Sequence, residues 1–237
     1  MSKIQLFIPC FVDQLFPESA INMLKILKEA ELEVEYNPNQ TCCGQPAFNS
    51  GYWNEAATVA KKWISDMQRY DSTIVSPSSS CVGFVRNYYG DIFPADENCQ
   101  NLTGKTYEFT EYLVDVLGKT DFNAKLEANA VYHDSCAALR ECKIKEAPRK
   151  LLSNVKGLNL VDLPDSEQCC GFGGTFSVKF EPISAAMAEK KVLNALSVGA
   201  EIIISSDLSC LMQLQGYISN KKLPIKTMYI ADVLVCR

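Results

Sequence analysis

The chain has 237 residues, of which 47% are hydrophobic, 22% charged and 10% aromatic, a composition typical of a folded globular protein. Acidic residues number 28 against 23 basic ones, which gives a formal net charge of −5, and no segment is rich in Lys or Arg. Because nucleic-acid binding depends on a basic surface, we expect no nucleic-acid partner.

The apolar segments are too short to predict a membrane protein. None approaches the roughly 18 consecutive apolar residues that a membrane helix requires. The first apolar segment, residues 4–12, is interrupted by Gln5 and Pro9 and has no small-residue cleavage site of the kind that ends a signal peptide. We therefore expect a cytoplasmic protein with no membrane span. In a reducing compartment, the 11 cysteines favour metal binding or redox chemistry over disulfides.

Short β-rich segments alternate with helical segments in the first half of the chain. Strands are predicted at residues 4–8, 33–36, 73–76 and around 107–108. A helix is predicted to begin at Pro17, with Ile21, Leu24, Ile26 and Leu27 as its buried stripe. Further helices are predicted over residues 53–68, from near residue 81, and over 110–117.

The second half repeats this order of strands and helices. Strands are predicted at residues 130–133, 158–162, 200–205 and 225–227. Helices are predicted over residues 147–154, 182–198, 208–220 and 229–236. Alternating strands and helices imply parallel sheets covered on both faces. We expect two tandem Rossmann-like α/β lobes, residues 1–120 and 128–237, joined by a short polar connection at 118–128.

The cysteines indicate that the chain contains an internal repeat. Eight of them form two sets of four, and each member of the first set has a counterpart in the second at a nearly constant offset along the chain. The first set is Cys10, Cys42, Cys43 and Cys81, and the second is, in the same order, Cys136, Cys169, Cys170 and Cys210.

Each set is predicted to meet at one edge of its sheet. Every cysteine of a set follows a predicted strand or lies in the turn next to one, and the carboxyl ends of parallel strands lie at the same edge. Four thiolates from three loops suit either zinc or an iron–sulfur cluster. Gly44 and Gly171 follow the two Cys-Cys pairs and would permit tight turns whose backbone N–H groups approach the sulfurs.

The chain resembles the cysteine-rich CCG-domain family, which includes the cysteine-rich subunit of heterodisulfide reductase and the iron–sulfur subunit of glycolate oxidase. The resemblance rests on a single Cys, then Cys-Cys-Gly, then another single Cys, a pattern that occurs twice with closely similar spacing. The segments 40–51, His133-Asp-Ser-Cys136 and 169–176 most resemble the lactate-utilisation branch of this family. The resemblance implies an iron–sulfur electron-transfer subunit that works with two other subunits in oxidising L-lactate to pyruvate.

One position departs from the family pattern. In the heterodisulfide reductase subunit the last motif is Cys-x-x-Cys, which gives five cysteines per site and a non-cubane cluster. Here Ser78 and Asp207 stand at the first of those positions. Four thiolates then remain in each set, so we expect two cubane [4Fe–4S] clusters, with Ser78 and Asp207 serving as helix N-caps.

The remaining candidates have ordinary structural interpretations. Cys99, Cys142 and Cys236 have no counterpart in the other half and are expected to be spare thiols, although Cys142 could substitute for a lost ligand. His133, the only histidine, should lie near the second set, where it hydrogen-bonds or supports the site rather than acting as a general base.

Two other classes of function stay open. A zinc-stabilised binding module would use the same thiolates without redox chemistry. A thiol–disulfide redox protein is the third possibility, although the usual Cys-x-x-Cys motif is absent from the sequence. No flavin or nicotinamide motif and no acid/base pair is evident, so the catalytic residues are unknown and lactate as substrate depends on the resemblance alone.

Overall fold

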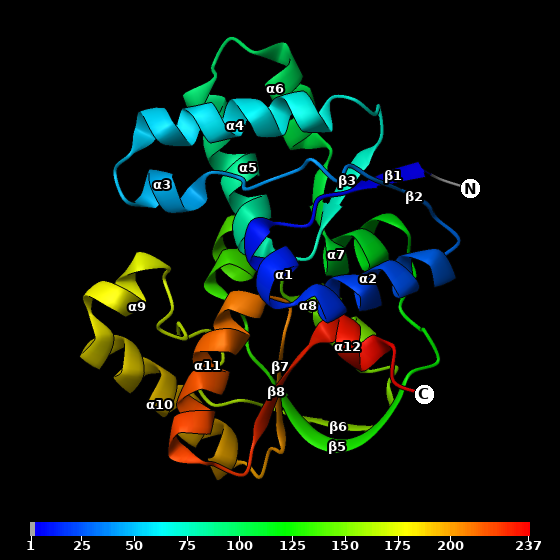
Figure 1. Ribbon diagram of the computed structural model, residues 1–237. Helices are drawn as coiled ribbons and strands as arrows, with labels where there is room; N and C mark the ends of the chain where they lie inside the picture. The colour runs from blue at the N-terminus through cyan, green and yellow to red at the C-terminus, as the bar shows by residue number, and fades with distance from the viewer. Residues whose placement is uncertain (1–2) are drawn as a thin grey trace.

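The computed structural model describes residues 3–237, which form two four-stranded sheets with every neighbouring pair of strands parallel (Figure 1). The first sheet has the order β2-β1-β3-β4 and the second the order β6-β5-β7-β8, so the two orders are equivalent. The predicted α/β fold with two similar lobes is confirmed. The strands are β1 (Lys3–Leu6), β2 (Glu33–Tyr36), β3 (Thr73–Ser76), β4 (Thr106–Glu108), β5 (Lys125–Tyr132), β6 (Lys156–Val161), β7 (Ile202–Ser205) and β8 (Lys226–Tyr229).

The helices of the first half connect these strands and cover the first sheet. Two predicted helices, over 53–68 and from near 81, correspond to α4 and α5. The predicted helix over 110–117 is a short α-helix that continues into a π-helical turn. The elements are α1 (Cys10–Leu15), α2 (Pro17–Glu29), α3 (Gln45–Asn49), α4 (Trp53–Met67), α5 (Ser79–Ile92), α6 (Glu97–Gly104), α7 (Phe109–Glu111) and the π-helical η1 (Tyr112–Val116).

The second half repeats the arrangement with differences in detail. Its strand β5 begins at Lys125, inside the connection that the sequence predicted at 118–128. The connection is shorter because β5 pairs with β6 from Lys125 onward. The helical elements are the π-helical η2 (Ala137–Glu141), α8 (Glu146–Leu152), α9 (Thr175–Lys179), α10 (Glu181–Ser197), α11 (Leu208–Lys221) and α12 (Ile230–Leu234).

Helix α2 shows where the predicted buried stripe was partly wrong. Ile26 and Leu27 are fully buried as predicted, but Ile21 is 46% exposed. Met23 is fully buried instead. At about 100° per residue, Met23 lies on the same face as Ile26 and Leu27, whereas Ile21 falls outside that arc.

The two lobes share one hydrophobic core. Helix α12, at the end of the chain, packs beside α2 from the beginning of it (Figure 1). The Asp232 carboxylate accepts hydrogen bonds from Ser19 Oγ at 2.8 Å and Asn22 Nδ2 at 2.9 Å. The Tyr229 hydroxyl, which is buried, donates to the Pro77 carbonyl at 3.1 Å. We propose that residues 1–120 and 128–237 are two lobes of one folding unit.

We expect a chain cut after residue 120 not to fold as two separate pieces. The largest core cluster contains Met23 and Leu27 from the first lobe together with Leu151 and Ile230 from the second, so separation would expose apolar surface on both pieces. The measurement is the thermal unfolding of residues 1–120 by circular dichroism. A cooperative transition close to that of the whole chain would contradict the proposal.

None of the helices within residues 3–237 has the length and apolar composition needed to cross a membrane.

Candidate metal centres

The first set of cysteines converges beyond the carboxyl ends of β1, β2 and β3. Cys10 begins α1, Cys42 and Cys43 lie in the loop between β2 and α3, and Cys81 is in the first turn of α5. The strand ends are aligned, since Leu6 pairs with Tyr36 on one side and Val75 on the other. The loops that follow the strands therefore begin at one level of the sheet.

The four thiols of the first set form a continuous chain of contacts. Cys42 interacts with the side chains of both Cys10 and Cys43. The Sγ of Cys43 lies 3.3 Å from the Sγ of Cys81. The structure thus brings together all four cysteines that the sequence grouped as the first set.

The second set has the same connectivity. Cys136 immediately precedes η2, Cys169 and Cys170 lie between β6 and α9, and Cys210 is in the first turn of α11. Cys136 donates to Cys169, while Cys170 contacts both Cys169 and Cys210. The same order of contacts in both lobes extends the sequence repeat to three dimensions.

One cysteine in each set has a lowered pKa. Hydrogen bonds from Cys10 and Cys43 lower the pKa of Cys42 to about 3, and the Gly44 N–H donates to the same sulfur at 3.3 Å. Hydrogen bonds from Cys136 and Cys170 lower the pKa of Cys169 to about 2, with the Gly171 N–H at 3.4 Å. Because the thiolate is the form that binds metals, a lowered pKa favours the metal-binding form of Cys42 and of Cys169.

The donor thiols in both sets have raised pKa values. The hydrogen bond to Cys42, followed by burial, raises the pKa of Cys10, and the hydrogen bond to Cys169, followed by burial, raises that of Cys136. Several thiolates crowded together without a cation would repel one another. A bound cation would remove this repulsion and allow the other thiols to ionise.

Gly44 and Gly171 are required by the shape of the two Cys-Cys turns. Their φ values are 93° and 92°, a region that L side chains rarely adopt. A Cβ on Gly44 would lie 3.0 Å from the Ala56 carbonyl oxygen of α4, and one on Gly171 would lie 2.6 Å from that of Ser184 in α10. Glycine therefore allows the turn and also the close packing of a helix against it.

The predicted N-caps are present. Ser78 Oγ accepts from the Cys81 N–H at 3.4 Å, and Asp207 Oδ1 accepts from the Ser209 N–H at 3.0 Å. These caps fix the first turns of α5 and α11, which carry Cys81 and Cys210. Both cysteines therefore lie near the positive end of a helix dipole, which favours a negatively charged sulfur.

Aromatic side chains surround the first site. The rings of Phe7 and Trp63 pack edge to face with centroids 5.5 Å apart, and Trp63 packs in the same way against Tyr89 at 5.3 Å. The Tyr89 hydroxyl donates to the Cys43 carbonyl at 2.7 Å. The backbone of the Cys-Cys turn is thus fixed from an apolar core.

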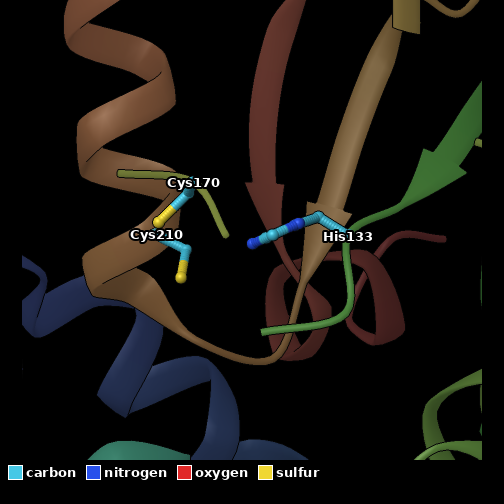
Figure 2. A group of neighbouring side chains, drawn as sticks. All are labelled: His133, Cys170 and Cys210. Atoms are coloured by element: carbon cyan, nitrogen blue, oxygen red, sulfur yellow. The ribbon is translucent and has the colours of Figure 1, made fainter. Parts of the chain in front are cut away.

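Two buried basic groups lie near the second site, His133 and Lys191. His133 is fully buried, and burial, followed by the charge of Lys191, lowers its pKa to about 4. A lowered pKa favours the neutral imidazole, the form that can bind a metal. Figure 2 shows the ring pointing toward Cys170 and Cys210, and the ligand atoms of the three side chains lie within 4.8 Å of one another.

Lys191 was not identified from the sequence. Its side chain is fully buried, and burial lowers its pKa to about 8. Its Nζ donates to the Ser166 carbonyl at 3.1 Å and to the Asp165 carbonyl. The feature of the sequence that could have indicated its burial is its position in the buried stripe of α10, one residue before Val192 and three after Ala188.

A buried ion pair supports the loop before Cys136. Arg149 donates from both Nη atoms to the Asp134 carboxylate at 2.7 Å, and its guanidinium lies 5.1 Å from the centre of the Tyr132 ring. The Asp134 side chain is 2% exposed and that of Arg149 is 29% exposed. Removing the arginine would leave the carboxylate buried without a partner.

We expect Arg149→Met to lower the free energy of unfolding by about 2–3 kcal/mol, somewhat less than for a fully buried pair because Arg149 is partly exposed. The matched control is Lys145→Met, which breaks the exposed pair with Glu167 and should cost below about 1 kcal/mol. Urea unfolding of both variants measures the difference. Equal losses of unfolding free energy in the two variants would show that the buried pair stabilises the protein no more than the exposed pair does.

The three unmatched cysteines lie outside both sets of thiol contacts. Cys99 is buried in the core of the first lobe. Cys142 is buried, with its Sγ donating to the Ser79 carbonyl at 3.3 Å, and burial raises its pKa to about 12. Cys236 Sγ donates to the Asp232 carbonyl at 3.3 Å. All eleven cysteines are free thiols.

The two sites face each other across the boundary between the lobes. The ring of Phe11, next to Cys10, lies 6.0 Å from the ring of Phe172, which is two residues after Cys170. The buried Asp207 carboxylate lies close to the Ser80 backbone, so the first turns of α5 and α11 are also near each other. The surroundings of the two sites therefore approach each other at two places.

Comparison with known proteins agrees with this duplicated geometry. The family model described as a cysteine-rich domain, CCG, matches residues 4–86 and 130–215. Lactate utilization protein A 2 of Bacillus cereus (strain 03BB102) is 41% identical over 236 residues, covering 98% of this chain and 97% of that protein. Lactate utilization protein A 1 of Bacillus mycoides (strain KBAB4) is 44% identical over 237 residues, covering 98% and 96%.

A solved structure shares the fold at low sequence identity. The crystal structure of a hypothetical protein from Helicobacter pylori superposes with a TM-score of 0.60 and 12% identity, covering 99% of this chain and 48% of that one. This similarity concerns the fold alone. The two family matches each contain one complete set of four cysteines, and the relatives match over nearly their whole length. The chain therefore belongs to the CCG cysteine-rich domain family, together with proteins named Lactate utilization protein A.

Proposed function

We propose that this chain is an iron–sulfur electron-transfer subunit of a lactate-oxidising system. The first set of cysteines would hold one [4Fe–4S] cluster and the second set another. The observation that carries the proposal is the convergence of four thiols, in the same order of contacts, at equivalent edges of two sheets. Four cysteine ligands are what a cubane cluster requires.

The residues around the thiols fit such a cluster. A [4Fe–4S] cluster with four thiolates is anionic, and it supplies a centre that accepts and releases single electrons. The Gly44 and Gly171 N–H groups donate to sulfur atoms of their own sets, which reduces the cost of gathering negative charge. The helix N-termini that carry Cys81 and Cys210 act in the same direction.

The chain itself would place the two centres and limit the access of water to them. The apolar rings of Phe11 and Phe172, which follow Cys10 and Cys170 closely in the chain, lie 6.0 Å apart between the two sites. Cys43, Cys170 and Cys210 are buried, so only part of each site faces solvent. An arrangement of two neighbouring sites, each partly covered, is suited to moving electrons between partner proteins.

Lactate as the substrate of the whole system is supported by the names of the relatives, which cover nearly all of this chain. We propose that the partners are the other subunits of a lactate-utilisation complex. The chain itself has sites for electrons and no motif for a flavin or nicotinamide that would accept a hydride from lactate.

We therefore expect the isolated chain to have no measurable lactate-oxidising activity. The measurement is lactate-dependent reduction of an artificial electron acceptor, with the purified chain alone and then with added candidate subunits. Full activity of the chain alone would contradict its role as a subunit that only carries electrons.

A zinc site is the second candidate, favoured by one observation. The ligand atoms of His133, Cys170 and Cys210 all lie within 4.8 Å of one another, a spacing that a single tetrahedral ion can bridge. Zinc would make the protein a stabilised binding module without redox chemistry.

One experiment separates these candidates. The chain is purified under anaerobic conditions without a histidine tag, and iron, acid-labile sulfide and zinc are measured per chain. About eight iron and eight sulfide per chain are expected for two cubane clusters. Zinc without sulfide would support the binding module, and a metal-free chain with reversibly oxidised thiols would support a thiol–disulfide redox protein.

A further inference from the structure

The two sites differ at one pair of equivalent positions. His133 lies three residues before Cys136, as Phe7 lies three residues before Cys10. The helices that pack on the two Cys-Cys turns can be aligned in the same way. A Cβ added at Gly44 would contact Val59 of α4, and one added at Gly171 would contact Met187 of α10. Trp63 lies four residues after Val59, and Lys191 lies four residues after Met187, so Lys191 is the counterpart of Trp63. The aromatic pair Phe7–Trp63 of the first lobe is therefore replaced by His133 and Lys191 in the second.

Neither ring nitrogen of His133 makes a hydrogen bond of normal geometry within residues 3–237; the Ser166 backbone lies close enough to act on its pKa, but the Ser166 carbonyl accepts from Lys191. Both ring nitrogens are buried and unpaired, although buried polar atoms in proteins are nearly always satisfied. Lys191 does not satisfy them, because its Nζ is directed to the carbonyls of Asp165 and Ser166. In Figure 2 the ring instead points toward the sulfurs of Cys170 and Cys210. An unpaired imidazole directed at two thiols has the arrangement of a metal ligand.

We propose that His133 is a ligand of the metal at the second site, where it binds alongside Cys170 and Cys210. The second site is then a mixed nitrogen and sulfur site, in which His133 takes the place of one of the two other thiolates of the second set, Cys136 or Cys169, whereas Phe7 leaves the first site with sulfur ligands alone. The identification of the metal as iron rests on the function proposed above. The assignment of His133 as a ligand rests on its burial, its unpaired nitrogens and its distance from the two thiols.

This ligand would make the two centres unequal as electron carriers. Imidazole is a neutral ligand where thiolate is anionic, so it stabilises the reduced, more negative state of the centre. Lys191 adds a positive charge near Cys169 and Cys170, for which the first lobe has the uncharged Trp63. Both differences act to raise the reduction potential of the second centre, against the buried Asp207 that stands where the first lobe has Ser78. We expect the balance to favour the second centre, so that an electron shared by the two centres resides there.

The sequence makes the test specific, because His133 is the only histidine in the chain. The full chain is produced with ¹⁵N-labelled histidine and no histidine tag, purified anaerobically, reduced with dithionite and studied by pulsed electron paramagnetic resonance. We expect the hyperfine coupling of a directly bound ¹⁵N nucleus on one of the two centres. The coupling should persist in Cys81→Ser, which removes a ligand of the first centre, and disappear in His133→Phe.

The variants also separate ligation from the effect of charge. His133→Phe places in the second lobe the residue that the first lobe carries, and should lower the potential of the second centre in a redox titration. Lys191→Met should lower that potential while leaving the ¹⁵N coupling in place. If His133→Phe does not fold, the ¹⁵N coupling of the unaltered chain still decides the question.

The failure of this proposal is distinct from the failure of the proposed function. Two iron–sulfur centres without ¹⁵N coupling on either would overturn the ligand assignment and leave the electron-transfer function in place. A chain that holds zinc and no iron would overturn the electron-transfer function. In that case the metal is replaced by ¹¹³Cd, and a ¹¹³Cd resonance split by ¹⁵N would support His133 as a ligand, whereas unsplit resonances at both sites would overturn it.

Discussion

Replacing Cys210 with serine should remove about half of the iron from the anaerobically purified chain, because it takes one thiolate from the second site only. Cys210 is buried in the first turn of α11 and shares a hydrogen bond with Cys170. The first site is assembled from the other lobe and should keep its cluster. Iron and sulfide per chain, measured with the electron paramagnetic resonance spectrum, provide the test.

The matched control for this substitution is Cys142→Ser. Cys142 is buried like Cys210, but its Sγ donates to the Ser79 carbonyl and it belongs to neither set of thiols. Its replacement should leave the iron content unchanged. Cys81→Ser and Cys99→Ser form the same comparison in the first lobe. Loss of iron from Cys142→Ser with none from Cys210→Ser would show that the ligands of the second site were assigned wrongly.

Adding a single methyl group at Gly171 should abolish the second site. With φ at 92°, an alanine there is strained, and its Cβ would lie 2.6 Å from the Ser184 carbonyl oxygen and 3.0 Å from Met187 Cβ. The turn that carries Cys169 and Cys170 would have to move away from α10. We expect Gly171→Ala to lower the free energy of unfolding by about 2–4 kcal/mol, from backbone strain together with the steric clash.

Gly199→Ala is the matched control, since Gly199 also has a positive φ, 72°, with nothing within 4 Å of the added Cβ. It should cost about 1 kcal/mol, from backbone strain alone, and leave the metal content unchanged. Denaturant unfolding and metal analysis of the two variants measure the contrast. If both lose the same stability and both keep the second metal, close packing of α10 on the turn is not what positions the cysteines.

Much of the fold could be predicted because the chain is a repeat with strong local patterns. Residues 33–36 and 73–76 form strands with the predicted bounds, and the helix over 53–67 ends one residue before the predicted one. The short helices α1, α3, α6 and α9 were not predicted. Each has eight residues or fewer, and a helix of that length depends on tertiary packing more than on its own sequence.

The grouping of the cysteines was also determined by the sequence. Nearly constant offsets between the two sets identify the repeat, and parallel strands place the loops after them at one edge of the sheet. These two facts are sufficient to group Cys10 with Cys81 and Cys136 with Cys210 without any coordinates. The N-cap roles of Ser78 and Asp207 followed from their place immediately before a helix, which is a local property.

Only the tertiary structure showed that the two sites have different surroundings. A lone histidine and a lysine in an otherwise apolar helical stripe have no pattern of their own, and the long stretch of chain between His133 and Lys191 hides their proximity. Packing of α10 against the end of β5 brings the imidazole, the ammonium and the thiols together. The sequence determined which sulfurs meet, because repeats and strand ends are properties of the chain. The burial and unpaired state of His133 were decided by contacts between distant segments.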